Sequence, residues 1–311
     1  MSVSYADRLF AAVERAGNPC VVGLDPHLAL LPDEFAVARD ARASRAERAR
    51  AIGDFLCAIV EVAAERVPAV KPQSAFFEVF GADGAKQFER VVAASKDAGL
   101  LVIGDVKRGD IGSTAAAYAR AFLTGIDGQD PRTLCDAITV NPYLGTDSIA
   151  PFVEECRAVG AGLYVLVRTS NPSSAEFQTV ETTDERGERA LLCDRVADAV
   201  VRWGGALRSE SGWSSIGADV GATHAEELTR LRARIPDTPL LLPGYGAQGA
   251  SAADIVGGFR RDGAGNLHGA LVNSSRGILF AGQKRPDVHW KDAAAGAMDA
   301  MATELRAALL A

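Results

Sequence analysis

The sequence has few cysteines, few histidines and no long apolar run, and each shortage excludes a class of protein. Its five cysteines are scattered along 311 residues, odd in number and without a CxxC pair, which favours a reduced, cytoplasmic protein over a disulfide-stapled one. Its four histidines show no HxxxH spacing, so we expect no histidine-based metal site. No run of about 18 uncharged apolar residues occurs, which argues against a membrane span.

Strongly basic stretches are missing as well. The chain carries 33 basic and 40 acidic side chains, a formal net charge of −7, which argues against nucleic acid as the main partner. A small anionic ligand stays compatible, because a local cationic pocket can lie inside an acidic protein. Charges interrupt the apolar residues of 1–17, so we expect an amphipathic helix there and not a signal peptide.

Short apolar, β-branched runs recur along the chain and alternate with helical patterns. Eight runs are candidate strands: 20–24, 67–71, 100–106, 137–141, 162–168, 214–220, 239–242 and 268–273. The helical patterns between them include 45–66, 83–98, 113–124, 147–159, 188–208 and 223–234. This alternation predicts an α/β fold, a single TIM (β/α)8 barrel over residues 1–311 with helical extensions at both ends. A doubly wound open sheet is the alternative, since counting strands does not show closure.

Four segments lie outside this alternation. Residues 33–50 and 125–133 are interpreted as surface elaborations, and 284–311 as a turn followed by an Ala-rich helix. Residues 171–187 are polar and follow the fifth strand, so we expect a mobile loop over a site.

The most informative segment is an apolar strand, 101–106, that runs into Asp105, Lys107 and Asp110. Side chains at i and i+2 of a strand lie on the same face. Asp105 and Lys107 are therefore expected to point together into the mouth of the barrel, where barrel enzymes carry their active sites. Lys71 ends the preceding strand, and the four residues are predicted to form an alternating array of charges. A salt-bridged strand end that only closes the barrel is the alternative.

Such an array suits a decarboxylation. A substrate carboxylate held about 4 Å from Asp105 is repelled by roughly 4 kcal/mol at an effective dielectric of 20. Loss of CO2 relieves this repulsion and leaves a carbanion, which Lys107 can stabilise and then protonate. We therefore interpret Lys107, Asp105, Lys71 and Asp110 as catalytic residues.

The string Asp105-x-Lys107-x-x-Asp110-Ile111-Gly-x-Thr114 resembles the signature of the orotidine 5'-phosphate decarboxylase family. The resemblance extends over roughly residues 20–280. Two further segments are similar to the longer bacterial subgroup of that family: 71–73 (KPQ) and 168–174 (RTSNPSS).

The resemblance implies a reaction and an assembly that spacing alone does not. It implies a cofactor-free and metal-free conversion of orotidine 5'-monophosphate to UMP, a step of pyrimidine biosynthesis, by a homodimer. It also implies that Lys107 is the proton donor, that Asp105 faces the substrate carboxylate, and that Lys71 completes the array. Asp110 and Ile111 are implied to enter the site of the partner subunit.

A phosphate site is predicted after the seventh and eighth strands. Gly244-Tyr-Gly246-Ala-Gln248-Gly249 satisfies GxGxxG, but it does not open a βαβ unit, so a dinucleotide fold is not expected. In barrels these two loops often bind phosphate, and glycines let backbone amides approach an anion. Arg276 offers a planar fork for phosphate oxygens. The alternatives to phosphate binding are a plain tight turn for the glycine-rich segment and a surface position for Arg276. The resemblance implies phosphate ligands at Gly246, Gln248 and Arg276.

Three further residues are assigned to the ribose and the base. Asp25 ends the first strand, where a carboxylate can accept hydrogen bonds from vicinal hydroxyls, although it can also cap a turn. The resemblance implies a ribose contact for Asp25, helped by Thr114, and a contact of Ser170 with the pyrimidine amide edge. Asn141, at the end of the fourth strand, is a further candidate for lining the pocket.

Three other functions compete with this interpretation. A metal-dependent sugar-phosphate decarboxylase or aldolase of the same superfamily would share the Asp-x-Lys core, and chelation would expose it. A Schiff-base aldolase would use Lys107 or Lys71 as nucleophile, and borohydride would trap it. A non-catalytic nucleotide-binding protein would bind ligand without releasing CO2.

Overall fold

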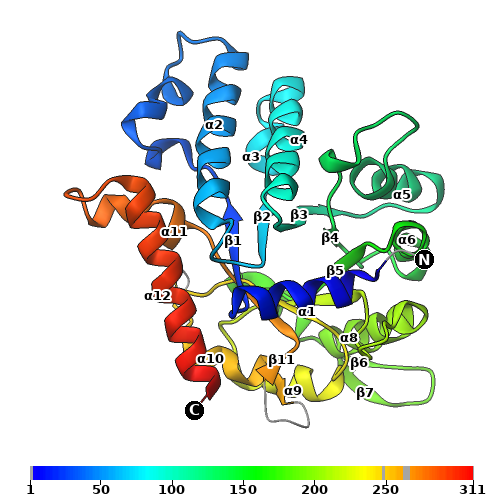
Figure 1. The fold of residues 1–311 in the computed structure, drawn as a ribbon. Helices are drawn as coiled ribbons and strands as arrows, with labels where there is room; N and C mark the ends of the chain where they lie inside the picture. Colours follow the sequence, from blue (N-terminus) through cyan, green and yellow to red (C-terminus); the bar gives the residue numbers. More distant parts are fainter. Residues whose placement is uncertain (1–2, 247–248, 262–266, 311) are drawn as a thin grey trace.

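The strands close into a barrel in the computed structural model, which describes residues 3–246, 249–261 and 267–310 (Figure 1). Eight parallel strands follow one another around it, and the last pairs back onto the first. Each strand therefore has two neighbours, and the predicted (β/α)8 barrel is confirmed over an open sheet. In order around the barrel they are β1 (Cys20–Leu24), β2 (Ala69–Pro72), β3 (Leu101–Arg108), β4 (Ala137–Val140), β5 (Gly162–Arg168), β8 (Ile216–Val220), β9 (Leu240–Leu242) and β12 (Ala270–Ser274).

Helices surround the barrel and pack their apolar faces on it. In α2 (Arg45–Ala63) the buried positions include Ile52, Phe55, Leu56 and Ile59, the spacing of one helix face. Ser44 and Glu47 form a capping box that fixes where this helix begins. The other helices of the barrel are α3 (Ala75–Glu78), α4 (Gly81–Asp97), α5 (Gly112–Ala119), α6 (Thr146–Val159), α8 (Leu192–Gly204), α9 (Ala225–Arg234), α10 (Ala252–Ile255), α11 (Arg276–Leu279) and α12 (Trp290–Leu310).

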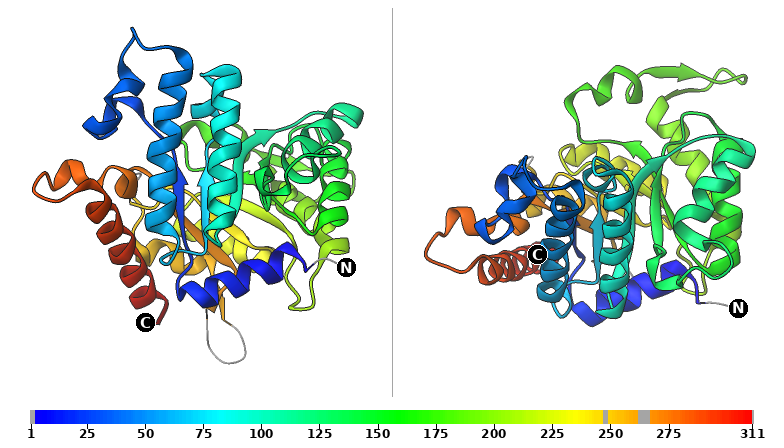
Figure 2. Two further views of the ribbon diagram at one scale, coloured as in Figure 1. Left: turned by 45° about the horizontal axis from the view of Figure 1, so that its top comes forward. Right: turned by 90° about the horizontal axis from the view of Figure 1, so that it is seen from above.

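The N-terminal helix closes one end of the barrel. α1 (Tyr5–Ala16) lies across the barrel in both views of Figure 2. Its Tyr5 hydroxyl lies 3.1 Å from the hydroxyl of Tyr164 on β5, and both side chains are buried. Leu9 packs beside them against inward-facing side chains of the strands. The interior at this end is therefore filled, and a ligand can enter only from the opposite end, where the strands terminate.

The expected helical regions differ from the structure at two places. The helix expected over 188–208 begins at Leu192, because Arg189–Leu191 is strand β7, paired with β6 (Glu181–Thr183). Turn chemistry at Asp184 explains the hairpin, since its Oδ1 accepts the backbone N–H groups of Arg186 and Glu188. The helix expected over 113–124 ends as a π-turn at 120–124.

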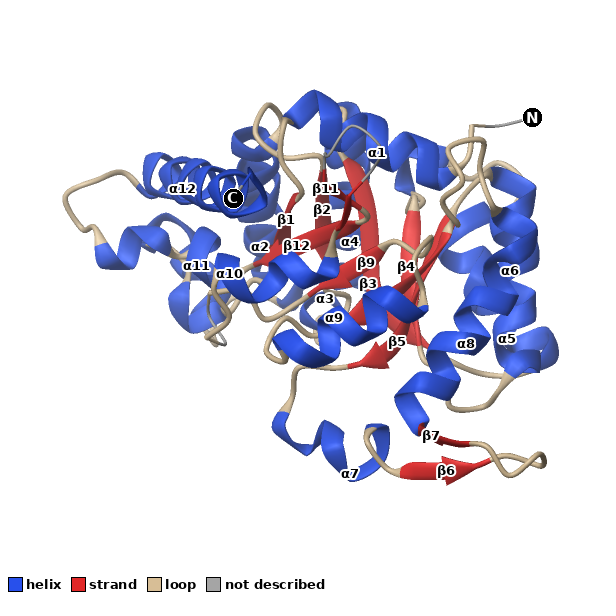
Figure 3. Cartoon of the chain, turned by 90° about the horizontal axis from the view of Figure 1, so that it is seen from below, coloured by secondary structure: helices blue, strands red, loops and turns tan. Residues whose placement is uncertain are grey.

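The polar segment after β5 carries structure of its own. It holds α7 (Ala175–Gln178) and the β6–β7 hairpin, and we call residues 172–191 the flap. Figure 3 and the right-hand view of Figure 2 show the hairpin standing away from the barrel. Its mobility stays a prediction. Over the described ranges, no helix is both long and apolar enough to cross a bilayer.

Candidate active site

The open end of the barrel contains a cavity of about 720 Å³. Its walls come from the ends of seven strands, which bring side chains from distant parts of the sequence together. Six of the residues singled out from the sequence line it: Asp25, Lys71, Asp105, Lys107, Ser170 and Arg276.

Asp105 lies between two lysines, and the three residues form what we call the charged triad. The Nζ atom of Lys71 donates to Oδ2 of Asp105, and Nζ of Lys107 donates to Oδ1. Lys71 and Asp105 are almost fully buried, whereas 44% of the Lys107 side chain is exposed. Lys107 is therefore the lysine of the triad that is more accessible to a ligand in the cavity.

The contacts within the triad hold Asp105 and Lys71 in their charged forms. Burial by itself would raise the pKa of Asp105, but Lys71 and Lys107 outweigh it and hold that pKa well below its ordinary value. Burial would likewise lower the pKa of Lys71, but Asp105 and then Asp25 outweigh it, and the pKa is raised. A carboxylate thus faces the cavity between two ammonium groups at neutral pH, although burying charge is costly unless it is paired.

Strand β3 is irregular where the triad lies. Lys107 has a φ of 44°, the only positive φ of a non-glycine residue within the described ranges, and the pairing with β4 shifts register between Gly104 and Arg108. The hydroxyl of Thr139 on β4 stabilises this bulge: it accepts the N–H groups of Val106 and Lys107, each at 3.0 Å. The same hydroxyl donates to Oδ1 of Asp105 at 3.0 Å.

Thr139 was not predicted from the sequence, because it lies in an apolar run with no charge beside it. Replacing it by valine, which has nearly the same shape, is expected to lower kcat about tenfold, since small misplacements of reacting groups cost up to about 10²-fold. The buried N–H of Val106 and the part-buried N–H of Lys107 also lose their acceptor, which should destabilise the protein by about 1–3 kcal/mol. Turnover and thermal unfolding test this. Thr303→Val, which removes an exposed hydroxyl on α12, is the control, and unchanged kcat and stability in Thr139→Val would contradict the role.

The ends of β1 and β12 contribute buried oxygen atoms without partners to the cavity. Oδ1 of Asp25, Oδ1 of Asn273 and Oγ of Ser275 are buried and accept or donate no hydrogen bond within the described residues. Buried polar atoms normally have a hydrogen-bond partner, so three unpaired oxygen atoms in one cavity indicate a hydroxyl-rich or polar ligand. Arg276 follows them, and no described residue forms an ion pair with it. Asn273 and Ser275 were not singled out from the sequence.

Other predicted site residues lie elsewhere. Asp110 does not line the cavity of its own chain, and its Oδ1 accepts the Ile111 N–H at 2.8 Å, so its place in the array of four charges stays a prediction. Ile111 and Thr114 are exposed beyond the end of β3.

Two further predicted residues, Gly246 after β9 and Asn141 after β4, do not line the cavity. Gly246 is exposed and does not line the cavity, unlike Gly244 and Tyr245 beside it. The prediction for Gln248 falls outside the described residues. Asn141 caps its own turn by accepting the Tyr143 N–H and does not line the cavity.

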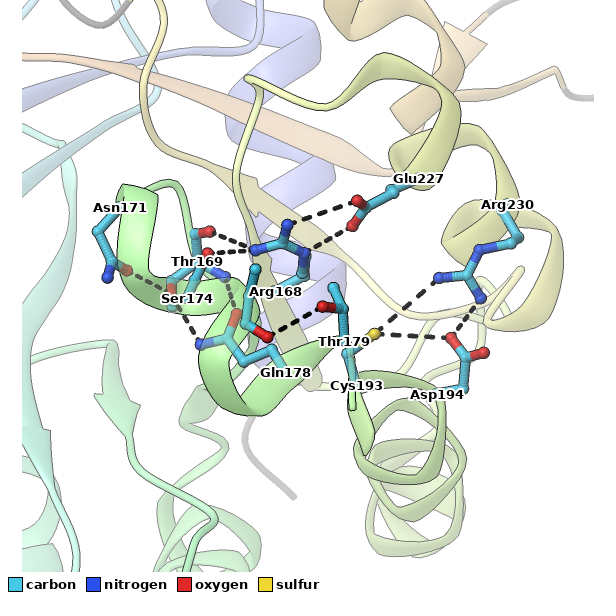
Figure 4. A network of polar contacts seen from close by, with 11 residues as sticks. Arg168, Thr169, Asn171, Ser174, Gln178, Thr179, Cys193, Asp194, Glu227 and Arg230 are labelled. Atoms are coloured by element: carbon cyan, nitrogen blue, oxygen red, sulfur yellow. Dashed lines mark hydrogen bonds and ion pairs between the residues drawn. The ribbon is translucent and has the colours of Figure 1, made fainter. Parts of the chain in front are cut away.

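The base of the flap is fixed by a buried arginine at the end of β5. Figure 4 shows the Arg168 guanidinium between Glu227 of α9, 2.6 Å away, and the hydroxyl of Ser174 in the flap. Gln178 accepts the Thr169 N–H and donates to the Thr169 hydroxyl, both at 2.8 Å. These contacts hold the segment that carries Ser170 against the cavity.

Strand β8 contributes a residue that sequence reasoning missed. Asp219 is buried and lines the cavity. The strand reads as an ordinary apolar run, and only the closed barrel reveals that this side chain points inward. Over the described ranges, no three His, Cys, Asp or Glu side chains gather closely enough to hold a metal ion.

Known proteins resemble this chain along its whole length. Residues 18–289, which include every residue of the cavity, match the model of the orotidine 5'-phosphate decarboxylase / HUMPS family. The orotidine 5'-phosphate decarboxylase of Rhodopirellula baltica is 39% identical over 98% of this chain and 99% of its own length. A solved structure from Streptomyces avermitilis, 38% identical, covers 100% of this chain and 98% of its own with a TM-score of 0.79. The structure of Leishmania donovani OMP decarboxylase, 30% identical, covers 99% and 100% with a TM-score of 0.75.

Proposed function

This chain belongs to the orotidine 5'-phosphate decarboxylase / HUMPS family and is a carboxy-lyase, and we propose that it removes CO2 from orotidine 5'-monophosphate without a cofactor, with Lys107 as the proton donor. The observation that carries the proposal is the charged triad in the cavity. A carboxylate held ionised between two ammonium groups can repel a substrate carboxylate and stabilise the charge that replaces it.

The proposed reaction breaks one carbon–carbon bond. The substrate carboxylate lies against Asp105, and the repulsion between the two anions is relieved when CO2 leaves. The electron pair of the broken bond stays on the ring carbon, next to the Lys107 ammonium. Lys107 then gives a proton to that carbon, and water returns one to the amine. Lys71, which is buried, keeps Asp105 ionised throughout.

The other end of the substrate is proposed to bind where the cavity has unpaired oxygens. Asp25 accepts hydrogen bonds from the ribose hydroxyls, and Arg276 binds the phosphate with the amides after β9. Ser170 contacts the pyrimidine. Binding energy from the remote phosphate can then be used to close the flap and to hold the reacting carbon against the triad.

A homodimer is part of the proposal. Ile111 is exposed and Asp110 is partly exposed just after β3, a position from which they can reach a neighbouring subunit. We propose that they enter the partner's site, as the resemblance implies. A cytoplasmic location stays a prediction.

The proposal predicts that purified protein converts orotidine 5'-monophosphate to UMP at the same rate with and without a chelator. The measurement is the loss of substrate absorbance, with CO2 release as a second readout. Loss of activity after chelation, restored by a divalent metal, would favour the metal-dependent sugar-phosphate enzymes of the superfamily. Binding of the nucleotide without any CO2 release would favour a non-catalytic binding protein.

A further inference from the structure

Asp219 is a further carboxylate in the cavity, and the proposed reaction does not use it. It lies on β8, which stands opposite β2 in the closed barrel, and only 5% of its surface is exposed. Within the described ranges its side chain has no hydrogen bond and no ion pair. A buried carboxylate without a partner is costly when it is ionised, so its presence beside the triad requires an account.

The groups around Asp219 are charged on one side only. On the adjacent strands β5 and β9 it pairs in register with Leu166 and Leu241, which carry no charge. Across the cavity it faces the triad, and Asp105 is the group there that repels it. Asp25, His27 and Arg276 line the same cavity from the ends of β1 and β12.

Asp219 changes charge close to neutral pH. Burial, and after it Asp105, raises the pKa of Asp219, and Lys107 and Lys71 oppose the rise without cancelling it, so that the pKa is about 7. Near neutral pH the site thus exists in two forms. In one, Asp219 is ionised and three carboxylates (Asp25, Asp105 and Asp219) share the cavity with two lysines. In the other, Asp219 is a neutral acid with an O–H to donate.

We propose that orotidine 5'-monophosphate binds to the form in which Asp219 is protonated, so that Asp219 acts as a proton-linked binding residue for the substrate's carboxylate. The inference rests on the proposed function. In the neutral form the acid can donate its O–H to the incoming carboxylate, whereas the ionised form adds a second repulsive anion to Asp105. The proton comes from water when Asp219 is reprotonated, and no other bond is made or broken.

The proposal makes substrate use depend on pH in a defined direction. Because kcat/KM reports the ionisation of the free enzyme, it should fall about tenfold per pH unit above the pKa of Asp219. The second ionisation of a phosphate monoester lies near pH 6, so the substrate phosphate adds no change there. UMP lacks the carboxylate, and its inhibition constant should depend much less on pH.

The test is kcat/KM for orotidine 5'-monophosphate from pH 6 to 9, for the wild type, Asp219→Asn and the exposed control Asp127→Asn. We expect the alkaline fall in the wild type and in the control, and a flat profile in Asp219→Asn, which cannot ionise. A flat wild-type profile, or a fall that persists in Asp219→Asn, overturns the proposal. An equally steep pH dependence for UMP overturns it too, even if the variant does not fold. Absence of turnover at every pH would instead refute the proposed function.

Thermal unfolding gives a second readout. The native protein keeps a proton on Asp219 that the unfolded chain releases between about pH 4 and 7, so wild-type stability should fall with pH over that range. The melting temperature of Asp219→Asn relative to the wild type should therefore rise from pH 5 to pH 8. A constant difference would overturn the assignment of a protonated Asp219.

Discussion

Replacing Lys107 by alanine is expected to lower kcat by about 10⁴-fold or more while the protein stays folded. A positioned general acid typically contributes about 10²–10⁴-fold. Loss of a preorganised group that stabilises developing charge typically costs a further factor of about 10²–10³. The fold should survive, because Lys107 is the more exposed lysine of the triad and Asp105 keeps its buried partner Lys71.

The control for Lys107→Ala is the replacement of a lysine that lies away from the cavity. Lys86 is exposed on α4, and Lys86→Ala should leave kcat unchanged. Thermal unfolding and UMP binding show whether the cavity of Lys107→Ala is intact. A kcat near that of the wild type, in a folded variant that binds UMP, would show that the proton comes from elsewhere. Trapping of the wild type by borohydride would point to a Schiff base instead.

Replacing Arg276 by alanine is expected to lower kcat/KM roughly 30-fold to 10³-fold. This corresponds to a loss of about 2–4 kcal/mol of transition-state stabilisation. Arg276 lines the cavity and has no ion pair within the described residues, so its charge is available for a ligand. It lines the cavity together with Gly244 and with Asn273 and Ser275, which carry unpaired oxygens. A guanidinium at this place can bind a phosphate with two parallel hydrogen bonds.

A substrate without the phosphate separates this role from a structural one. With the nucleoside orotidine, Arg276→Ala and the wild type should have the same low kcat/KM, because the contact removed by mutation is missing from the substrate as well. Arg285→Ala, which removes an exposed arginine outside the cavity, should match the wild type with both substrates. An equal loss with orotidine and with its monophosphate would contradict phosphate binding by Arg276.

The residues that sequence reasoning found share one property: they lie at or near the carboxyl ends of strands. Asp25, Lys71 and Asp105 each follow an apolar run, and the ends of parallel strands in a barrel converge on one mouth. Spacing along the chain was therefore enough to place them together. The same reasoning put Asp110 in the array, but Asp110 does not line the cavity of its own chain.

Thr139 and Asp219 lie inside strands, and the sequence gives no reason to choose them. Strands buried on both faces read as continuous apolar runs, so periodicity does not tell which side chains face the interior. In β8 the inward position holds Asp219, and in β4 it holds Thr139. Both could be recognised only after the pairing of strands fixed which side chains meet.

By itself, the sequence determined the alternation of strands and helices and their order, because apolar periodicity and turn residues act over short stretches of chain; the pairing of the first and last strands decided that the sheet closes. The sequence also determined that a carboxylate and an ammonium share one strand end. Only the tertiary structure decided the positive φ of Lys107, the hydroxyl of Thr139 beneath it and the place of Asp219 opposite the triad. These features depend on a bulge and on contacts between strands more than 30 residues apart, and such contacts exist only once the barrel has closed.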